Sequence, residues 1–526
     1  MSLLQPQLDK IIKQSTKIAN GPPTRYNLKP RIVSHDESKT YSKITFGERN
    51  KNKSHRVIIM VGETGTGKTT LLNTIVNYML GVKREDKVWF EITDDQSDRT
   101  SAHSQTSRIT VYGFYLQDSQ IDLTIIDTPG YGDTRGIDLD KEISASLLSL
   151  SKSAEGVNEI HAVCLVIKAT QNRLSERQIY IFDAVQSLFG RDIVENIVLL
   201  FTHSTGKAPK NALTAVKEAK IKCAVNDKNQ PVYFLFDNCQ SEAADDEDDD
   251  DEEGETIQNQ SWNRSFRGTE KFFSFLDTIQ PKSLQMTQDV LQKRKQLEAN
   301  VSNLQSRVHE IELKQNELKE IQEALEKNKE YVKKNKNFEY EVNVPYKKRV
   351  NIDTSKASVA MCCTVCEENC HYPGCWKYTF FSWCEMFEAG YCTVCTNECH
   401  KDKHVKEDKI YVQKTKKVIK TYTDLKKKYD DMIGDGVFLV RKLTEELQEY
   451  EEKKIKLLNE AFDCVQTLQD IALNTDSVNT LLHSDFLIEK LKEIDEAEKA
   501  TILENMKKAG EEKQGAVGYF KSFLKK

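Results

Sequence analysis

The stretch GETGTGKTT, residues 62–70, constrains most strongly what this chain can fold into. It directly follows the strand-like run VIIMV and leads into the helix-like run LLNTIVNYML. Gly62, Gly67, Lys68 and Thr69 stand in register with the pattern G-x-x-x-x-G-K-[ST]. The pattern and its strand–loop–helix context together predict a P-loop at the edge of an α/β sheet.

The residue types of this loop suit phosphate binding. Glycines let backbone N–H groups curl around phosphate oxygens, and the N-terminus of the following helix adds a partial positive charge. We expect Lys68 to reach the β- and γ-phosphates of a nucleotide, and the Thr69 hydroxyl to ligate Mg²⁺. The candidate phosphate-binding residues are Gly62, Glu63, Thr64, Gly65, Thr66, Gly67, Lys68, Thr69 and Thr70.

A second motif, LTIIDTPGYGDTRG, ends another strand-like run. We expect Asp127 to hold the Mg²⁺ shell and the Gly130 N–H to meet the γ-phosphate. Together with the P-loop, this motif predicts a phosphate-sensing switch.

The polar stretch SAHSQTSRITVYG lies between the two motifs. A switch loop needs a hydroxyl that completes the Mg²⁺ shell only when the γ-phosphate is present. Thr106 is our candidate, with Thr100 and Ser107 as rivals. The alternative is an ordinary loop threonine without this role.

Residues 56–240 alternate short apolar runs with helical patterns, which is typical of a sheet with helices on both faces. A strongly acidic run follows, and we interpret it as a solvated, disordered loop. The expected domains are a lead-in with one strand (1–55), a P-loop G domain (56–280, with the acidic loop at 241–256), a helical stalk (284–340), a β-hairpin with a Cys/His-rich metal module (341–415) and a returning helical region with a basic tail (416–526).

Apolar residues of the stalk fall on a heptad grid, which predicts a seam for another helix. They are Val290, Leu297, Val301, Leu304, Val308, Ile311, Leu318, Leu325 and Val332. Two alternatives remain open at this point: a helix pair packed within one chain, and an intermolecular coiled coil.

The two nucleotide motifs carry a resemblance. GETGTGKTTLLNT and DTPGYGD resemble the corresponding septin motifs. Residues 56–240 as a whole resemble the septin-related group that contains the immunity-associated nucleotide-binding (GIMAP) proteins and the Toc GTPases of the chloroplast envelope. The resemblance does not extend to the C-terminal half. It implies GTP or GDP with Mg²⁺ as ligands, and self-association through the G domain.

The run NIVLLFTHSTG ends without the carboxylate that usually pairs with guanine, and Thr205 stands in its place. LLFTHSTGKAP is similar to a Toc receptor stretch that also lacks this carboxylate. The resemblance implies that His203 packs against the base and that an acid–Asn pair after a later strand recognises it. Here that pair is Asp237 and Asn238, after PVYFLF.

A carboxylate accepts two N–H donors, which matches the edge of guanine. We therefore assign Asp237 to that edge and Asn238 to supporting the loop. The alternative is a plain turn after a strand.

Catalysis is predicted to be slow. Tyr131 occupies the position where many GTPases carry the glutamine that orients the attacking water. Dimerisation across the nucleotide faces would let a partner's group complete the site. Arg135 is the candidate in-trans arginine, Arg108 and Arg173 are rivals, and a plain surface charge is the alternative.

The sequence CTVCEENCH recurs as CTVCTNECH after 29 residues. Thiolate and imidazole ligands in this spacing favour tetrahedral Zn²⁺, and two ions need about eight ligands. The candidates are Cys363, Cys366, Cys370, His371, Cys375, Cys384, Cys392, Cys395, Cys399, His400 and His404. Disulfides and free thiols are the alternatives. The strand-like segments that flank the module should pair antiparallel and carry it at the far end of the stalk.

Charge and hydropathy narrow the remaining choices. The net charge of −6 comes from the acidic run, and no apolar run reaches the roughly 18–20 residues of a membrane span. No signal peptide is visible at the start, so we expect a cytoplasmic protein, either free or peripheral to a membrane. GYFKSFLKK at the end is either a frayed helix or a weak membrane contact, and no element suggests nucleic-acid binding.

The sequence thus predicts a GTPase that switches, self-associates and carries a zinc-stabilised helical arm for oligomerisation or for a protein partner at the cysteine-rich tip. The competing hypothesis is a non-hydrolysing, nucleotide-bound scaffold whose zinc tip binds a partner. An ATPase is a third, less favoured hypothesis.

Overall fold

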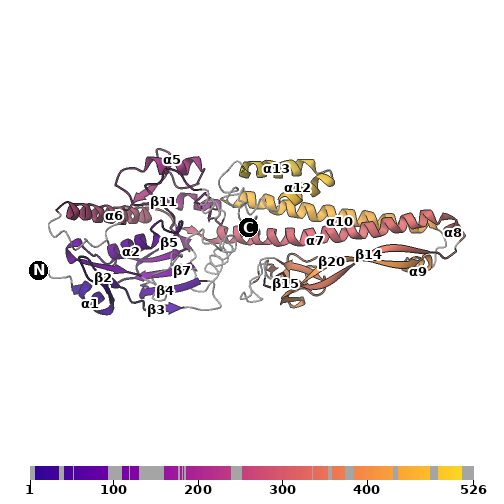
Figure 1. Cartoon of the computed structure of the whole chain (residues 1–526), viewed down its shortest axis with the longest axis horizontal. Helices are drawn as coiled ribbons and strands as arrows, with labels where there is room; N and C mark the ends of the chain where they lie inside the picture. Colours follow the sequence, from indigo (N-terminus) through magenta and orange to yellow (C-terminus); the bar gives the residue numbers. More distant parts are fainter. Residues whose placement is uncertain are drawn as a thin grey trace. The chain divides into compact units, whose positions relative to one another are not determined.

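The structure is a computed structural model, and its chain forms two compact units (Figure 1). The first comprises residues 1–291, 471–478 and 509–526, and the second comprises residues 292–470 and 479–508. The structure describes residues 6–34, 41–50, 52–92, 109–117, 119–128, 159–175, 178–179, 182, 185–186, 188–238, 252–334, 336–353, 358–372, 384, 386–429, 436–473 and 484–511.

The first unit is built on an eight-stranded sheet with the order β12-β11-β10-β5-β8-β7-β4-β3. The strands from β12 to β8 run parallel to one another, and β7 turns antiparallel to β8. Their bounds are β3 (Ile32–Ser34), β4 (Tyr41–Gly47), β5 (Ser54–Val61), β7 (Ile109–Tyr115), β8 (Ile121–Asp127), β10 (Ala162–Lys168), β11 (Ile197–Thr202) and β12 (Tyr233–Leu235).

Side chains of the central strands alternate between two cores, one on each face of the sheet. On β5, Ile58 and Met60 belong to one core, while Ile59 and Val61 belong to the other. Helices α2 (Lys68–Met79) and α6 (Glu252–Thr278) contribute to the first core, and α5 (Lys210–Glu218) contributes to the second. The expected α/β sheet with helices on both faces is therefore present.

The N-terminal segment contributes more than the single strand that we expected. Besides β3 and β4, it forms α1 (Pro6–Gln14), β1 (Thr16–Ala19) and β2 (Thr24–Asn27). Strands β1 and β2 form a small sheet with β6 (Val88–Glu91), and Leu8 of α1 is fully buried in the core. The segment lacks the long apolar runs of a core strand, and for that reason its sequence looked like a polar lead-in.

Short pieces complete this unit. They are η1 (Arg84–Asp86), β9 (Glu159–Ile160), η2 (Arg191–Asn196) and β13 (Lys282–Ser283), and β9 pairs antiparallel with β13. Of the expected acidic loop at 241–256, residues 241–251 lie outside the described residues, and helix α6 begins at Glu252.

The second unit is organised around two long helices, α7 (Gln285–Lys327) and α10 (Gly436–Ile471). Leu304 and Val308 of α7 share a core with Leu458 and Phe462 of α10, and with residues of α12 (Ser484–Glu493) and α13 (Ala497–Glu511). The heptad seam of α7 is thus covered within the chain, which is the first of the two alternatives.

A long antiparallel ribbon runs beside α7. Strands β14 (Glu339–Asn351) and β20 (Lys409–Thr421) pair along their whole length, from Glu339 opposite Thr421 to Asn351 opposite Lys409, as the sequence predicted. Tyr340 and Val342 pack with Leu318 and Leu325 of α7. Helices α8 (Lys329–Lys333) and α9 (Tyr422–Lys428) stand where the ribbon meets the end of α7.

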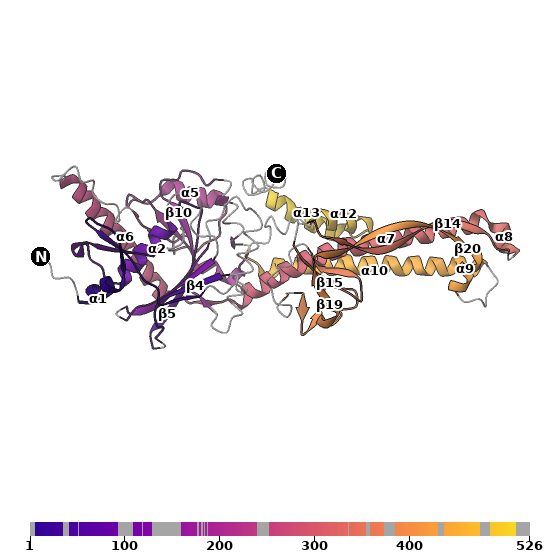
Figure 2. The same ribbon diagram turned by 60° about the horizontal axis from the view of Figure 1, so that its bottom comes forward.

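The ribbon carries the cysteine module back along α7, so the predicted position at the far end of the stalk is wrong (Figures 1 and 2). The module contacts the N-terminal half of α7, because Ala299 lies in its core and Asn303 donates hydrogen bonds into it. The reversal occurs at α8, where the chain leaves α7 and turns back as β14. The module consists of β15 (Ala360–Cys363), β16 (Glu368–His371), β17 (Phe387–Glu388), β18 (Tyr391–Cys392), η4 (Lys401–Lys403) and β19 (His404–Glu407).

Among the described helices, none combines the length and the apolar character needed to cross a bilayer. The C-terminal segment GYFKSFLKK lies outside the described residues.

Candidate nucleotide site and cysteine cluster

The P-loop joins the end of β5 to the start of α2. Lys68 is buried, and its Nζ atom donates a hydrogen bond to the Gly62 carbonyl at 2.7 Å. Gly67 has a φ of 86°, and a Cβ there would lie 2.5 Å from the Asn238 amide nitrogen, so only glycine fits. The lysine side chain therefore folds back onto the backbone of its own loop.

Asp127 ends β8, next to β5 in the sheet. Its side chain is buried, and its Oδ1 atom has no hydrogen-bond partner among the described residues. Burial raises the pKa of this carboxyl group to about 6, although the nearby Lys68 ammonium opposes the shift. Burial also lowers the pKa of Lys68, and Asp127 opposes that shift in turn. An orphaned carboxylate oxygen near a buried ammonium is suited to take part in a Mg²⁺–phosphate site.

Thr128, which follows Asp127, is held to β5 by two hydrogen bonds. Thr128 donates from both its backbone N–H and its hydroxyl to the carbonyl oxygen of Met60, at 3.2 and 2.9 Å. The chain after β8 therefore starts at a set point beside the P-loop.

The three residues assigned to the base lie together beside the P-loop. The His203 N–H donates to the Asp237 carbonyl at 3.1 Å, which ties the ends of β11 and β12. The Asn238 amide nitrogen donates to the Gly67 carbonyl at 3.1 Å, so this side chain contacts the P-loop. A Cβ on Gly67 would also lie 3.5 Å from the His203 ring.

Both His203 and Asn238 adopt a left-handed backbone, with φ values of 52° and 70°. Such conformations are uncommon for residues other than glycine and gather at binding sites. The Oδ1 atom of Asn238 is buried and accepts no hydrogen bond from the part of the chain that the structure describes. This acceptor is therefore available to a ligand at the mouth of the P-loop.

Two further residues that hold the candidate site together, Arg264 and Thr202, were not predicted from the sequence. Arg264 of α6 forms an ion pair with Asp237, and it donates to the Ser204 carbonyl at 2.9 Å. Thr202 at the end of β11 donates to the Thr66 carbonyl at 2.7 Å. Arg264 comes 27 residues after Asp237, so no local pattern could have linked the two.

Several predicted catalytic residues lie outside the described residues. These are Thr106 with its rivals Thr100 and Ser107, Gly130, Tyr131, Arg135 and Arg108. Arg173 is described and is exposed on the surface. Their assignments remain predictions.

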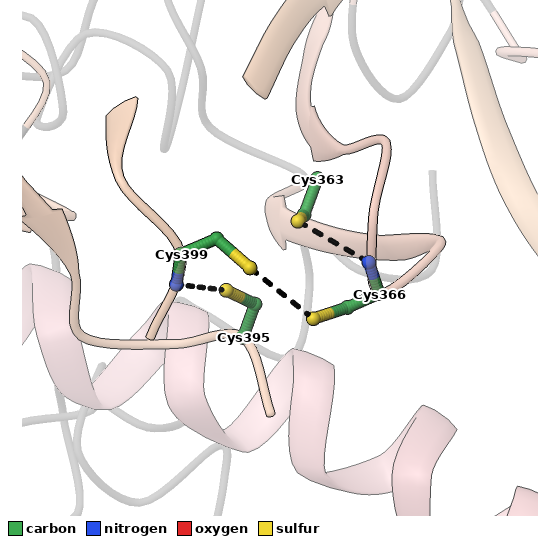
Figure 3. Close-up of side chains that lie close together, drawn as sticks. All are labelled: Cys363, Cys366, Cys395 and Cys399. Carbon is green, nitrogen blue, oxygen red and sulfur yellow. Dashed lines mark hydrogen bonds between the residues drawn. The ribbon is translucent and has the colours of Figure 1, made fainter. Parts of the chain in front are cut away.

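The cysteine module brings ligand atoms into two groups. One is Cys363, Cys366, Cys395 and Cys399, and the other is Cys370, Cys392, Cys395 and His404; within each group the ligand atoms lie within 4.8 Å of one another. Figure 3 shows the four sulfur atoms of the first group between two loops of the module. Thiolate-rich groups of four fit tetrahedral Zn²⁺.

Protons are shared unevenly within the second group. Hydrogen bonds with Cys392 and Cys395 raise the pKa of Cys370, whereas the bond from Cys370 lowers the pKa of Cys392 to about 4. Several thiolates this close repel one another, so protons or a cation must neutralise them. A metal ion would displace these protons.

Among the described zinc candidates, three stand outside both groups: His371, Cys384 and His400. His371 Nδ1 lies 3.4 Å from the sulfur of Cys384, so these two residues form a separate pair. His400 Nδ1 lies 3.0 Å from an Asp402 carboxylate oxygen. Cys375 lies outside the described residues, and none of the described cysteines forms a disulfide.

Comparisons with known proteins find a family match in part of the first unit. Residues 56–260 match the model of the AIG1 family, in agreement with the resemblance of the sequence motifs. The match ends at residue 260.

Two curated relatives come from Arabidopsis thaliana. Immune-associated nucleotide-binding protein 7 is 28% identical over 154 residues, which cover 29% of this chain and 42% of that protein. Immune-associated nucleotide-binding protein 1 is 27% identical over 147 residues, which cover 28% of this chain and 55% of that protein. The chain therefore spans about half the length of the curated relatives it matches.

Among solved structures, Toc33 from Arabidopsis thaliana in complex with Mg²⁺ and GMPPNP is 18% identical, with a TM-score of 0.26. The alignment covers 42% of this chain and 87% of that one.

Proposed function

We propose that the AIG1 domain binds GTP and GDP with Mg²⁺, hydrolyses GTP slowly on its own, and completes hydrolysis by dimerising through this domain. The observation that carries the proposal is the proximity of two buried groups: Lys68 Nζ, 2.7 Å from the Gly62 carbonyl, and Asp127 Oδ1, which forms no hydrogen bond with any described residue. A buried ammonium at the start of α2 and a buried carboxylate at the end of β8 match the charges of a triphosphate and its cation.

The phosphate end of the site follows from the backbone. The P-loop N–H groups and the start of α2 would surround the phosphates, and Lys68 would leave the Gly62 carbonyl for the β- and γ-phosphate oxygens. Thr69 and Asp127 would hold Mg²⁺, which neutralises charge on those oxygens. Thr106 would complete the Mg²⁺ shell, and the Gly130 N–H would meet the γ-phosphate.

At the base end, His203 packs against guanine and Asp237 accepts its N1–H and N2–H₂ donors. The Arg264 ion pair supports this role, because it holds the Asp237 carboxylate beside the ends of β11 and β12. The left-handed backbone at His203 and Asn238 supports it further, since both residues thereby turn towards Gly67.

Hydrolysis needs a group that orients the attacking water. Many GTPases use a glutamine for this purpose, but here Tyr131 occupies its position. A second copy would provide it, with Arg135 as the group acting in trans. The zinc-stabilised helical arm, residues 292–470, serves oligomerisation or binds a protein partner through its cysteine module.

The test compares three full-length proteins in GTP and ATP binding and in turnover at several protein concentrations. The unchanged protein should prefer GTP, and its turnover per molecule should rise with protein concentration. Lys68→Ala should lose both nucleotides, because the phosphates lose their cation. Asp237→Ala should keep ATP binding but weaken GTP by about 1–3 kcal/mol, the usual cost of stranding buried donors.

Each component of the proposal can fail separately. Tight GTP binding by Lys68→Ala would remove the P-loop assignment, and an unchanged GTP/ATP ratio in Asp237→Ala would remove that residue from the base site. Negligible turnover at every concentration, with nucleotide still bound, would favour the non-hydrolysing scaffold.

A further inference from the structure

The two groups of metal-ligating atoms in the cysteine module have one member in common. Cys395 belongs to the group with Cys363, Cys366 and Cys399, and also to the group with Cys370, Cys392 and His404. Two tetrahedral ions with separate ligands need eight donors, and these two groups contain seven residues.

We propose that the module binds two zinc ions and that the Cys395 thiolate bridges them. This rests on the zinc-stabilised arm of the proposed function and goes beyond it, because it fixes the number of ions, their ligands and the shared atom. A thiolate sulfur carries several lone pairs, so it can donate to two ions at once. The bridge gives each ion four ligands from seven residues.

The first group already has the spacing of a zinc site. The sulfur atoms of Cys366 and Cys399 are 3.7 Å apart (Figure 3). Zn–S bonds of about 2.3 Å in a tetrahedron separate the sulfurs by about 3.8 Å. The Cys366 N–H donates to the Cys363 sulfur at 3.4 Å, as backbone donors do when they stabilise a thiolate.

The second group has an imidazole in position. His404 is 4% exposed, and its Nδ1 lies 3.2 Å from the His400 carbonyl. That contact makes Nδ1 the protonated nitrogen, which leaves the lone pair on Nε2. Nε2 is buried and makes no hydrogen bond of normal geometry within the described residues, so its lone pair is available to a metal ion held with Cys370, Cys392 and Cys395. The Cys392 sulfur accepts N–H bonds from Val394 and Cys395, both at 3.4 Å.

Cys395 itself is suited to the shared position. Its side chain is 3% exposed, and its sulfur accepts an N–H bond from Cys399 at 3.3 Å. The seven ligands would bring six thiolate charges against four charges from two Zn²⁺ ions. One cation lies beside the first group, because Lys347 donates to the Cys366 carbonyl at 2.8 Å, and both residues line a cleft that also reaches Cys395. The same cleft, with a volume of about 530 Å³, offers a path for the metal to enter.

The ligand sets cross between the two sequence repeats. The first ion would take Cys363 and Cys366 from one repeat and Cys399 from the other, and the second would take Cys370 from the first repeat and Cys392 from the second. Both ions therefore fasten the repeats to each other, and the two sites share one ligand, Cys395.

The first experiment counts zinc per chain in reduced full-length protein during titration with a chelator. The unchanged protein should hold two ions. Cys392→Ala and Cys399→Ala, which each remove a ligand from one site, should release one ion at chelator concentrations that leave the unchanged protein loaded. Cys395→Ala should release both at that concentration. Cys362→Ser is the matched control, because this buried neighbour instead contacts the Asn369 side chain and the Lys409 carbonyl, and it should keep both ions.

The second experiment needs no variant and so does not depend on a variant that folds. Cadmium replaces zinc in the unchanged protein, and NMR correlates each cadmium resonance with the Hβ protons of its cysteine ligands. The protons of one cysteine, Cys395, should correlate with both cadmium resonances.

Loss of only one ion from Cys395→Ala, or two cadmium resonances without a common cysteine, would overturn the bridge and leave the zinc-stabilised arm intact. A content of one zinc ion per unchanged chain would also overturn the bridge and leave the zinc-stabilised arm intact. No zinc or cadmium binding at all would instead refute the arm itself, and the bridge with it.

Discussion

The burial of the Asp127 carboxyl group affects the stability of the fold. It is buried, and burial raises its pKa to about 6 against an ordinary value of 3.8. The folded protein therefore binds this proton more tightly than the unfolded chain does. The resulting contribution to stability is present below about pH 4 and is lost as the pH rises through about 6. At neutral pH, without nucleotide and Mg²⁺, the ionised carboxylate destabilises the fold by roughly 2–3 kcal/mol.

We therefore predict that Asp127→Asn stabilises the nucleotide-free protein at pH 7.5 by roughly 2 kcal/mol, with a gain that shrinks towards pH 4.5. The variant should also lose the strengthening of GTP binding by Mg²⁺. Urea unfolding across this pH range and GTP titrations with and without Mg²⁺ measure the two effects. Asp122→Asn is the control, because Asp122 is equally buried but lies at the opposite end of β8, where its Oδ2 accepts a hydrogen bond from the Asn50 N–H. A gain that is independent of pH would contradict the account.

The contact between helix α7 and the cysteine module depends on a buried amide. Asn303 is 2% exposed, and its Nδ2 donates to the Glu368 carboxylate at 3.1 Å and to the Val394 carbonyl at 2.9 Å. Glu368 also accepts the Thr396 N–H at 3.1 Å. One helix position thus ties together the strand of the first cysteine repeat and the loop of the second.

We predict that Asn303→Ala destabilises the docked module by about 1–3 kcal/mol, because two buried acceptors lose a donor. Hydrogen exchange across residues 360–407 should become faster, while exchange in the P-loop unit stays the same. Asn316→Ala, an exposed asparagine on the same helix, should change neither region. Equal exchange in Asn303→Ala and in the unchanged protein would show that packing alone holds the module.

The whole molecule divides into two units, each with its own cores. A ligand that binds only one folded unit stabilises only that unit, and about 100 times its Kd raises the free energy of unfolding by about 2.7 kcal/mol. The proposed ligands differ between the units: nucleotide with Mg²⁺ for the first, and zinc for the second.

Calorimetry of the full chain should therefore show two transitions. GTP with Mg²⁺ should raise the melting temperature of one, and a zinc chelator should lower that of the other. The transition that responds to GTP should stop responding in Lys68→Ala. A single transition that shifts with both ligands would show that the units unfold together.

The sequence by itself determined the features that depend on neighbours along the chain. The P-loop, the buried central strands and the pairing of β14 with β20 each follow from a local spacing or an alternation of side chains, and the residue types of the cysteine repeat fix the chemistry of its ligands. In such segments the backbone period itself decides which side chains share a face.

Only the tertiary structure decided which distant segments meet. The Arg264 partner of Asp237, the return of the ribbon along α7 and the membership of Cys395 in both ligand groups join residues that no local pattern connects. A heptad seam shows that a helix needs an apolar partner, and a row of cysteines shows that a metal is expected. The heptad seam does not specify which helix covers it, because any apolar surface of the right shape could do so. The cysteine repeat does not specify which thiolates share an ion, because all of them are chemically alike. Only the packing of the folded chain selects the partners.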